Sequence, residues 1–326
     1  MLKLGIIGTG SISHHFIEAC RLSGAYQLAA VYSRHQETAE TFITNYSNCN
    51  IFTDLREFLT SDLDIIYIAS PNSIHFEQAK AAIKAKKHVI VEKPAFSTPK
   101  ELQEILQLAK DNHVFFFEAA RNIHEKALET VKLFLSHKTI IGASFNYAKY
   151  SSKMNALLNG EHPNIFSSKF SGGALADLGV YPIYAAIYLF GKPLLANYTA
   201  SLLDSGVDIN GDGNLIYPDF RVSIKTGKNY ETTLPAEIYT TDGTLILNHI
   251  QAISSVTFKK HDGSCEELSL NNLQHPMLEE VICFSNIIKS NDLTHYHSLL
   301  ELAQGVSHTL FTMRQDAGIR FEADYD

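Results

Sequence analysis

The chain opens on Leu2–Gly10 (LKLGIIGTG), a short apolar strand that runs into a glycine-rich turn. The next residues, Ser11–Phe16 (SISHHF), are typical of the first turns of a helix. A glycine turn between a strand and a helix lets the backbone approach a pyrophosphate, which the amide groups and dipole of the helix N-terminus then hold. The turn alone is a weak signal, because Ser13 fills the third small position of the motif and isolated glycine motifs match by chance.

A second apolar strand, Leu28–Ser33, ends about 20 residues after the turn, where the dinucleotide fingerprint places the residue that contacts the ribose. An acidic residue there would accept hydrogen bonds from the ribose 2′-hydroxyl and repel a 2′-phosphate. Ser33 and Arg34 stand there instead, a hydroxyl and a guanidinium that can pair with a phosphate in a fork. The sequence therefore predicts NADP(H) as the preferred cofactor, with NAD(H) as the alternative.

Strands and helices alternate throughout the first 120 residues or so. Continuous apolar strands between helices indicate a parallel sheet that is covered on both faces. Thr98-Pro99-Lys100-Glu101 is a full helix start, with an N-cap threonine, a proline at the first position and a glutamate that completes a capping box. We therefore predict an N-terminal doubly wound parallel Rossmann domain over residues 1–121. Its other expected strands are Asn50–Phe52, Asp64–Ala69, His88–Val91 and Val114–Phe117, and its other expected helices are Glu37–Phe42, Leu55–Leu59 and Ile74–Lys86.

The pattern changes beyond Arg121. After one helix at Glu125–Leu135, alternating apolar and polar segments follow, separated by turns such as Thr226-Gly227 and Asp242-Gly243. Period-two segments joined by such turns are typical of an antiparallel sheet. We predict a second domain over residues 122–326, an α+β fold with a large, mostly antiparallel open sheet that binds substrate and supports a homodimer or homotetramer. Its expected strands are Ile141–Tyr150, Asn197–Leu203, Phe220–Ile224, Thr232–Tyr239, Thr244–Asn248 and Ser255–Lys259, and its closing helices are Met277–Lys289 and Leu299–Arg314.

Composition limits the class of protein. The 326 residues are 45% hydrophobic and 19% charged, an ordinary globular balance with enough apolar surface for a large core. The formal charge is −8 and there is no basic run, which argues against a nucleic-acid partner. The four cysteines lack paired spacing, the first residues do not match a signal peptide, and the longest apolar stretch, Val180–Phe190, is short for a bilayer. We expect a cytoplasmic protein without a membrane partner.

Two patterns were weighed as metal sites. The fifteen histidines show no ligand spacing with a third partner, so we expect no catalytic zinc. Asp208–Asn214 (DINGDGN) has the oxygen spacing and central glycine of a calcium loop, with Asp219 at the twelfth position. The shorter aspartate replaces the bidentate glutamate and strands flank the segment, so a polar hairpin turn is the favoured interpretation.

Several segments follow one another in a characteristic order: the glycine turn, Ser70-Pro71-Asn72 with His75, His88–Pro94 (HVIVEKP) and Gly172–Tyr181 (GGALADLGVY). With them the chain resembles the Gfo/Idh/MocA oxidoreductases over nearly its whole length. The segments around Glu92-Lys93-Pro94 and Gly172–Tyr181 are specific for this resemblance, whereas the glycine turn adds little. The lysine of HVIVEKP is expected at the carboxyl end of a strand, where open α/β sheets place their ligands.

The resemblance implies that Lys93 acts at the reacting carbon and that the Lys93–Pro94 bond is cis. Ser171 stands where the family usually has a first glycine, and Tyr181 stands where many members have histidine. A tyrosine there is similar to the glucose-fructose oxidoreductase and dihydrodiol dehydrogenase branches, and we take it to argue against inositol dehydrogenase-like members. The implied catalytic residues are Lys93, Asp177 and Tyr181, and substrate would also contact Arg121. The implied cofactor-binding residues are Gly8, Thr9, Gly10, Ser11, Ile12, Ser33, Arg34, Ser70, Pro71, Asn72, His75, Glu92 and Lys93.

These residue types suit the oxidation of an alcohol, which sends a hydride to the nicotinamide and a proton to a base. A tyrosine, with an ordinary pKa near ~10, is a poor base unless a cation stabilises its phenolate. Lys93 can supply that field and polarise the substrate oxygen. Asp177 and Tyr181 are four residues apart and would share one face of a helix, although Pro182 is expected to kink or break that helix near Gly179.

The sequence thus predicts an NADP(H)-dependent oxidoreductase that acts on a CH–OH or C=O group of a sugar, sugar derivative or dihydrodiol. The alternative is a non-catalytic, nucleotide-sensing regulatory protein of the same fold. The joint presence of Lys93, Asp177 and Tyr181 favours the enzyme, because a pure binder needs no acid/base group beside the nicotinamide.

Overall fold

The computed structural model describes residues 1–325, which fold into two units. Unit 1 consists of Met1–Ala119 and His275–Glu301. Unit 2 consists of Ala120–Gln274 and the residues from Leu302 onward. The first boundary lies close to the expected one at residue 121. The stretch 275–301 differs from expectation, because the sequence placed it in the second domain.

Unit 1 is built on a six-stranded sheet of order β3-β2-β1-β4-β5-β6, in which every neighbouring pair is parallel. This is the strand order of a doubly wound dinucleotide fold, so the predicted fold class is confirmed. The strands are β1 (Leu2–Ile7), β2 (Tyr26–Tyr32), β3 (Asn50–Phe52), β4 (Ile65–Ile68), β5 (His88–Glu92) and β6 (Phe116–Ala119).

Helices cover both faces of this sheet, and the side chains of successive strand residues pack into two separate cores. On β4, Ile65 and Tyr67 pack into one core, while Ile66 and Ile68 pack into the other. All four side chains are fully buried, which explains why β4 is apolar at every position rather than at every second one. The helices are α1 (Ser11–Ser23), α2 (Gln36–Ile43), α3 (Leu55–Thr60), α4 (His75–Lys84), α5 (Pro99–Asn112) and the returning α9 (Leu278–Ser290), with a short η1 turn at Asn72–Ile74.

Residues 275–301 join unit 1 because their apolar side chains complete its core. The ring of Phe284 on α9 stacks on Phe117 of β6 at 4.5 Å between centroids. The hydroxyl of Tyr26 donates to the Val281 carbonyl at 2.9 Å. A helix that packs on a sheet far away in the sequence leaves no local mark of its partner, and this is why the sequence misassigned it.

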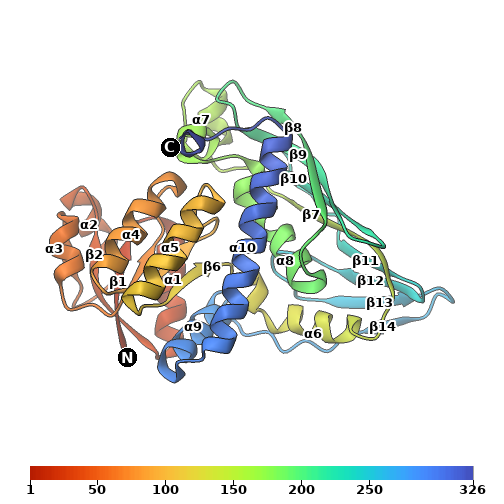
Figure 1. Ribbon diagram of the computed structural model, residues 1–326, viewed down its shortest axis with the longest axis horizontal. Coiled ribbons are helices and arrows are strands. Elements are labelled where there is room, and N and C mark those ends of the chain that lie inside the picture. The colour runs from red at the N-terminus through yellow and green to blue at the C-terminus, as the bar shows by residue number, and fades with distance from the viewer. Residues whose placement is uncertain (326) are drawn as a thin grey trace. The chain divides into compact units, whose positions relative to one another are not determined.

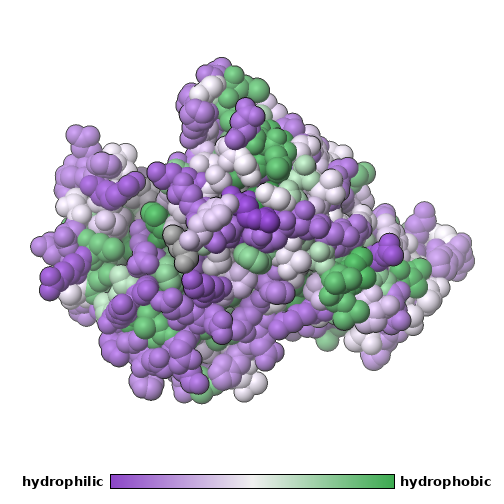
Figure 2. All heavy atoms as spheres, turned by 45° about the horizontal axis from the view of Figure 1, so that its top comes forward, coloured by the Kyte–Doolittle hydropathy of each residue, from purple (hydrophilic) through white to green (hydrophobic). Residues whose placement is uncertain are grey.

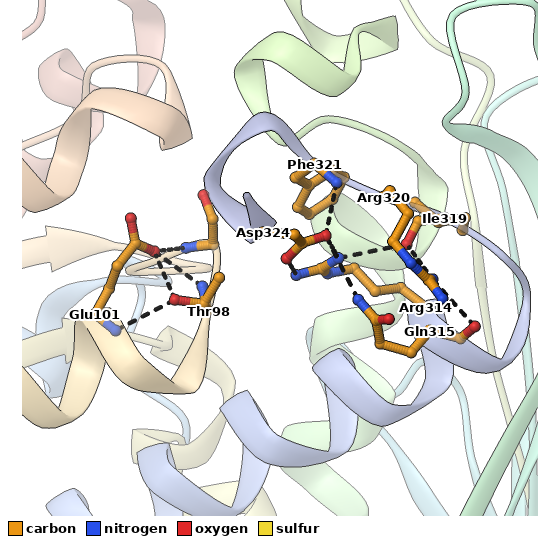
Figure 3. A network of polar contacts seen from close by, with 9 residues as sticks. Thr98, Glu101, Arg314, Gln315, Ile319, Arg320, Phe321 and Asp324 are labelled. Atoms are coloured by element: carbon orange, nitrogen blue, oxygen red, sulfur yellow. Dashed lines mark hydrogen bonds and ion pairs between the residues drawn. The ribbon is translucent and has the colours of Figure 1, made fainter. Parts of the chain in front are cut away.

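Figure 3 shows one predicted local contact and one that was not predicted. The capping box of α5 is confirmed: the Thr98 hydroxyl accepts from the Glu101 amide, and the Glu101 carboxylate accepts from the Thr98 amide at 2.9 Å. In unit 2, the carboxylate of Asp324 accepts from the guanidinium of Arg314 near the end of the last helix. Arg314 is nearly buried and also lies over the ring of Phe321 at 4.2 Å, so it fastens the C-terminal segment to α10.

Unit 2 carries an eight-stranded sheet of order β14-β13-β12-β11-β7-β10-β9-β8 (Figure 1). All neighbouring pairs are antiparallel except β7 and β10, which are parallel. The predicted mostly antiparallel sheet is therefore confirmed. The strands are β7 (Ile140–Ala148), β8 (Leu195–Leu202), β9 (Asp208–Ile216), β10 (Arg221–Gly227), β11 (Ala236–Thr240), β12 (Gly243–Leu247), β13 (Val256–Lys260) and β14 (Cys265–Glu267).

The helices of unit 2 include one long helical run that carries predicted site residues. It changes type along its length, from the π-helix η5 (Leu175–Gly179) to α8 (Val180–Phe190). The helix does not break near Gly179; its type changes there from π to α, and Pro182 lies inside the first turn of α8. The other helical elements are α6 (Lys126–Leu135), α7 (Met154–Leu158), α10 (Leu293–Asp316), which begins in unit 1, and the short turns η2 (Arg121–His124), η3 (Asn164–Phe166), η4 (Ser168–Phe170) and η6 (Glu322–Asp324).

The helical run Ser168–Phe190 is long and apolar enough to cross a membrane by length and composition, unlike the shorter stretch weighed from the sequence. Of its most apolar window, 72% is buried inside the structure. Such burial is typical of a core helix, which is its role in unit 2. The space-filling view in Figure 2 shows mostly hydrophilic residues on the displayed face, with scattered hydrophobic patches that are usual for a globular surface.

The interpretation of Asp208–Asn214 as a hairpin turn is wrong, because these residues form most of strand β9. Gly211 and Gly213 allow the ring of Tyr198 on the neighbouring β8 to lie flat against the strand, where a Cβ at Gly211 would come within 2.4 Å of that ring. The carboxylate of Asp208 is buried and accepts hydrogen bonds from the Leu175 amide and the Tyr198 hydroxyl, both at 2.7 Å. The carboxylate thus anchors the start of η5 to the sheet.

We expect Asp208→Ala to destabilise the protein by about 2–4 kcal/mol, because it strands two buried donors that each cost roughly 1–3 kcal/mol when unpaired. The matched control is Asp212→Ala on the same strand, whose carboxylate is exposed and pairs loosely with Lys225 at 3.6 Å. That change should stay within about 0.5 kcal/mol. Urea unfolding of both variants measures the difference, and equal losses would remove Asp208 as an anchor.

Candidate active site and dinucleotide pocket

A pocket of about 290 Å³ lies in unit 1 at the carboxyl ends of β1, β2 and β4. The glycine turn forms one wall, with Gly8, Thr9 and Gly10. The residues after β4 form another wall, with Ser70 and Pro71. Sequence reasoning did not assign the remaining polar lining residues to the cofactor site: these are Tyr32, His35, Thr38 and Gln78.

The turn has the tight geometry that a phosphate cradle requires. Gly8 adopts φ +106°, and a Cβ on it would lie 2.5 Å from the carbonyl oxygen of Ala69. Ser13, which looked like a departure from the motif, is fully buried and donates its hydroxyl to the Gly8 carbonyl at 2.7 Å. The serine therefore ties the first turn of α1 to the glycine turn instead of loosening it.

The end of β2 presents an arginine to the same pocket. Ser33 and Arg34 both line it, and Arg34 is exposed. The Ser33 hydroxyl accepts from the amide of His35 at 3.3 Å, which helps to shape the turn after the strand. Among residues 1–325, no carboxylate forms an ion pair with Arg34. The guanidinium is therefore available to an anionic ligand.

Other predicted cofactor residues lie beside the pocket rather than in its wall. His75 is fully buried, with Nε2 at 2.7 Å from the Ser70 carbonyl and Nδ1 at 3.1 Å from the Ala95 carbonyl. Burial lowers the pKa of His75 to about 4, against the opposing effect of these carbonyls, so its ring is neutral at pH 7. His75 joins the loop after β4 to the segment after Lys93. Ser11, Ile12 and Asn72 begin α1 and η1 and are not among the residues that line the pocket.

Lys93 directly follows β5 in unit 1, and the Lys93–Pro94 peptide is cis, as the family resemblance implied. Glu92, the last residue of β5, accepts a hydrogen bond from the hydroxyl of the buried Tyr67 at 2.5 Å. The amide of Ala95 donates to Glu118 of β6 at 2.9 Å. These contacts hold the Glu-Lys-Pro segment on both sides of the lysine.

The remaining predicted site residues belong to unit 2, where Tyr181 lies in the first turn of α8. Its ring meets the ring of Tyr147 from β7 edge to face, with centroids 5.4 Å apart at 89°. The guanidinium of Arg121 lies 5.7 Å from the centroid of the Tyr181 ring. The buried Asn122 donates to the Tyr181 carbonyl at 3.1 Å. Two side chains, those of Tyr147 and Arg121, thus contact the Tyr181 ring, and a third holds its backbone.

Arg121 sits between two acidic or potentially acidic groups. It pairs with Glu125 at 3.4 Å and faces Tyr181. Burial by itself lowers the pKa of Arg121, but Tyr181 and Glu125 outweigh burial and raise the pKa above its usual value. The Arg121 guanidinium therefore brings a positive charge to the Tyr181 ring.

Asp177 lies in η5, and its carboxylate pairs with the ammonium of Lys228. Sequence reasoning missed this lysine. It read Thr226-Gly227 as a turn, whereas both residues belong to β10 and Lys228 follows directly after that strand. The signal available was a lysine at the end of an alternating apolar segment. The structure thus joins Arg121 to Tyr181 and Asp177 to Lys228 within unit 2.

The specific Gly-Gly segment before η5 also has a structural reason. A Cβ on Gly172 would lie 2.4 Å from the Ile165 carbonyl oxygen, and one on Gly173 would lie 2.2 Å from the Asp208 carboxylate. Ser171, which replaces the usual first glycine, adopts the left-handed conformation at φ +53°. Within residues 1–325 no group of three His, Cys, Asp or Glu side chains is placed to hold a metal ion.

Comparison with known protein families gives two matching regions. Residues 2–120 match the oxidoreductase family model with an NAD-binding Rossmann fold, and residues 142–246 match the GFO/IDH/MocA C-terminal domain. The chain belongs to the Gfo/Idh/MocA oxidoreductase family. Membership makes it an oxidoreductase with a nicotinamide dinucleotide site, which confirms the resemblance drawn from the sequence.

Two relatives match over almost the whole chain, and a third matches over about two thirds of it. The scyllo-inositol 2-dehydrogenase (NADP⁺) IolU of Bacillus subtilis is 35% identical over 99% of both chains. The oxidoreductase YgjR of Escherichia coli is 34% identical over 99% of both. The trans-1,2-dihydrobenzene-1,2-diol dehydrogenase of Danio rerio is 27% identical over 64% of this chain and 62% of its own.

Solved structures share the fold at lower identity. A 3-ketoreductase from Actinomadura kijaniata in complex with NADP superimposes with a TM-score of 0.83, at 19% identity and 97% coverage of both chains. An oxidoreductase from Bacillus subtilis, YvaA, gives a TM-score of 0.77 at 18% identity, covering 98% of this chain and 97% of its own. Both likenesses support the two-unit family fold.

Alanine substitutions at Gly8 and Gly10 are expected to have different effects, one on stability and the other on dinucleotide binding. Gly8→Ala forces a side chain against Ala69 at positive φ, so it should lower the melting temperature of the free protein, at a cost of about 1–3 kcal/mol. Gly10→Ala meets no protein atom within 4 Å, so the free protein should melt normally.

Gly10→Ala should instead weaken dinucleotide binding at least about tenfold, because its Cβ occupies the space where the backbone approaches the pyrophosphate. Thermal melting without cofactor and titration calorimetry with cofactor separate the two effects. Wild-type affinity in Gly10→Ala would contradict the pyrophosphate position.

Proposed function

We propose that this protein is an NADP(H)-dependent oxidoreductase that transfers a hydride between nicotinamide and a CH–OH or C=O group of a polyhydroxylated small molecule. The observation that carries the proposal is the presence of Lys93, Asp177 and Tyr181 in a chain with an intact dinucleotide pocket. A site with both a cofactor cradle and an acid/base group is equipped for catalysis. The activity is the reversible oxidation of an alcohol.

The preference for NADP(H) rests on Arg34. A guanidinium without a carboxylate partner, at the rim of a pocket in a chain of charge −8, favours the extra phosphate of NADP(H). Ser33 and Thr38 line the same end and supply hydroxyl donors. NADP also appears in the names of the inositol dehydrogenase relative and of a D-xylose 1-dehydrogenase of Haloferax volcanii that is 26% identical.

Within unit 2, Tyr181 is the proposed acid/base group and Arg121 its electrostatic support. When the substrate alcohol is oxidised, its proton passes to the Tyr181 oxygen, while a nicotinamide bound to the chain would take up the hydride. The positive charge of Arg121 stabilises a phenolate that accepts this proton. Lys93 is the proposed donor to the substrate oxygen, and Asp177 the proposed acceptor for a substrate hydroxyl. The bound dinucleotide would supply the hydride chemistry, cradled by Gly8–Gly10 and Arg34.

The substrate class is a sugar, sugar derivative, cyclitol or dihydrodiol. The expectation that Tyr181 argues against inositol dehydrogenase-like members finds no support, since such an enzyme is among the relatives that match the full length. A vicinal diol is the feature common to scyllo-inositol, trans-1,2-dihydrobenzene-1,2-diol and D-xylose, which the names of three relatives give. We therefore widen the predicted class to include inositols.

A nucleotide-sensing regulator remains the alternative, but the buried Lys228 beside Asp177 favours the enzyme. A pure sensor would have no use for a desolvated ion pair on the helical run that also carries Tyr181. We also propose that the protein works in the cytoplasm. For assembly we propose a homodimer or homotetramer through the open face of the unit 2 sheet, where Arg221, Ser223 and Lys225 of β10 are exposed while Val222 and Ile224 are buried.

The direct test is a turnover assay of the purified protein with NADP⁺ and NAD⁺ against aldoses, inositols and cyclic dihydrodiols. Absorbance of the reduced nicotinamide reports the reaction. Turnover with at least one polyol and a higher kcat/KM with NADP⁺ would support the proposal. Tight dinucleotide binding with no turnover across the panel would favour the regulator.

Arg34→Ala should weaken NADPH binding by on the order of 1.5–3 kcal/mol, the range for hydrogen bonds to charged groups, and should barely change NADH binding. The selectivity follows because the 2′-phosphate is the part of the ligand that a guanidinium at the end of β2 would contact. Fluorescence titration with both reduced cofactors measures it, and NADH serves as the internal control. Equal losses, or tighter NADH binding in the wild type, would contradict the assignment.

Lys93→Met and Tyr181→Phe should each impair turnover without preventing cofactor binding. Loss of an electrostatic donor at the reacting oxygen costs roughly 10²–10³ in kcat, and loss of a general acid/base roughly 10²–10⁴. NADPH affinity should stay within a few-fold. Because both residues serve one proton transfer, the double variant should lose less than the product of the single effects. Near-normal turnover of Lys93→Met would rule out this mechanism.

A further inference from the structure

Lys228 is a deeply buried cation near the proposed site. Its residue is 3% exposed, and its ammonium pairs with Asp177, whose side chain is 29% exposed. The ion pair therefore has one end in the interior and one end that reaches the surface. Such an arrangement directs the carboxylate outward from a fixed cation.

The lysine backbone is fixed at the end of the parallel strand pair. Its amide donates to the Ile209 carbonyl of β9 at 2.8 Å, and its carbonyl accepts from the Ser151 amide at 2.9 Å. Its neighbour Gly227 pairs in register with Ala148 of β7, one residue beyond Tyr147, whose ring contacts Tyr181. The main-chain position of Lys228 is thus set by three strands.

Stability alone does not account for this pair. Taking two charges out of water costs several kcal/mol per ion, and apolar residues of similar volume often replace a buried ion pair without loss of stability. Burial also disfavours an ionised carboxylate, whereas a cation in contact favours it. The contact with Lys228 therefore opposes proton uptake by Asp177.

Other ionisable groups lie on the elements that pack against η5. They are Tyr147 on β7, Asp208 and Asp212 on β9, Arg221 and Lys225 on β10, and Tyr181, Tyr184 and Tyr188 on α8. Asp208 is engaged by the Leu175 amide at the start of η5 and by Tyr198, and Lys225 pairs with Asp212 among exposed side chains. The ion pair with Lys228 places a buried cation on the Asp177 carboxylate.

We propose that Lys228 is a positioning residue that keeps Asp177 ionised and aimed at a hydroxyl of the polyhydroxylated substrate. It acts through Asp177 and does not itself touch the reacting atoms. The inference rests on the proposed function, and it adds a second cation that defines the pH range in which the enzyme recognises its substrate.

The experiment compares Lys228→Met, Lys228→Arg and the matched control Lys225→Met, which removes an exposed lysine three residues earlier. In Lys228→Met, the acid limb of the kcat/KM profile should move to higher pH by about 1–3 units, the size of a contact between opposite charges. KM should rise more than kcat falls, and alkaline pH should restore most of the activity. Lys228→Arg should largely retain the wild-type limb, and Lys225→Met should be indistinguishable from wild type.

An unchanged acid limb in Lys228→Met, or a loss that is equal at every pH, would overturn the proposal. A second measurement needs no activity. Asp177→Asn strands the buried ammonium, so it should lower the melting temperature more than Lys228→Met, which leaves only the more exposed carboxylate. The double variant Asp177→Asn/Lys228→Met should recover part of the difference.

Different results would contradict the proposed function and the proposed role of Lys228. Absence of wild-type turnover on the whole panel rejects the proposed function, and the melting order still decides whether Lys228 and Asp177 act as a pair. Wild-type turnover with a normal pH profile in Lys228→Met rejects the role of Lys228 and leaves the proposed function intact. A lower melting temperature for Lys228→Met than for Asp177→Asn would also contradict the proposed pairing.

Discussion

The buried carboxylate of Asp208 is the contact on which the geometry of unit 2 depends. It receives the Leu175 amide and the Tyr198 hydroxyl, and so fixes the first residue of η5 to the sheet. Gly173 must be glycine because any side chain would overlap this carboxylate. The positions of Asp177 to Tyr181 depend on this contact, because these residues lie on the helical run that starts at Leu175. A structural aspartate on one strand therefore sets the geometry of chemical groups on a helix.

The second constraint is the parallel pairing of β7 with β10 inside an otherwise antiparallel sheet. Parallel strands bring their carboxyl ends to one edge, and here Tyr147 and Lys228 arrive at that edge from different parts of the sequence. The helical run η5–α8 lies against these strands, with Asp177 toward the lysine and Tyr181 toward the tyrosine. The arrangement follows the general rule that ligands bind at the carboxyl ends of parallel strands, repeated in a unit with no dinucleotide motif.

Much of this could be predicted from the sequence, for identifiable physical reasons. The buried strand Ile65–Ile68 and the capping box at Thr98 are local patterns, so the Rossmann unit was predictable strand by strand. Lys93 and Tyr181 followed from motifs. Lys228 and the strand β9 did not, because a lysine gains its role from a partner 51 residues away and Asn-Gly-Asp-Gly is typical of turns. The glycines of β9 are explained only by the Tyr198 ring that packs on them, a contact that the local sequence does not encode.

The two units each contain a cation whose role depends on its surroundings. In a chain of net charge −8, two cations serve opposite purposes through opposite environments. Arg34 is exposed, without a carboxylate partner among residues 1–325, and suits a multivalent anion that arrives from solvent. Lys228 is desolvated and paired with Asp177, so its charge acts within the protein on the ionisation and orientation of that carboxylate. Burial therefore decides whether a positive charge recruits a ligand or organises the group that contacts one, and residue type alone could not have distinguished the two roles.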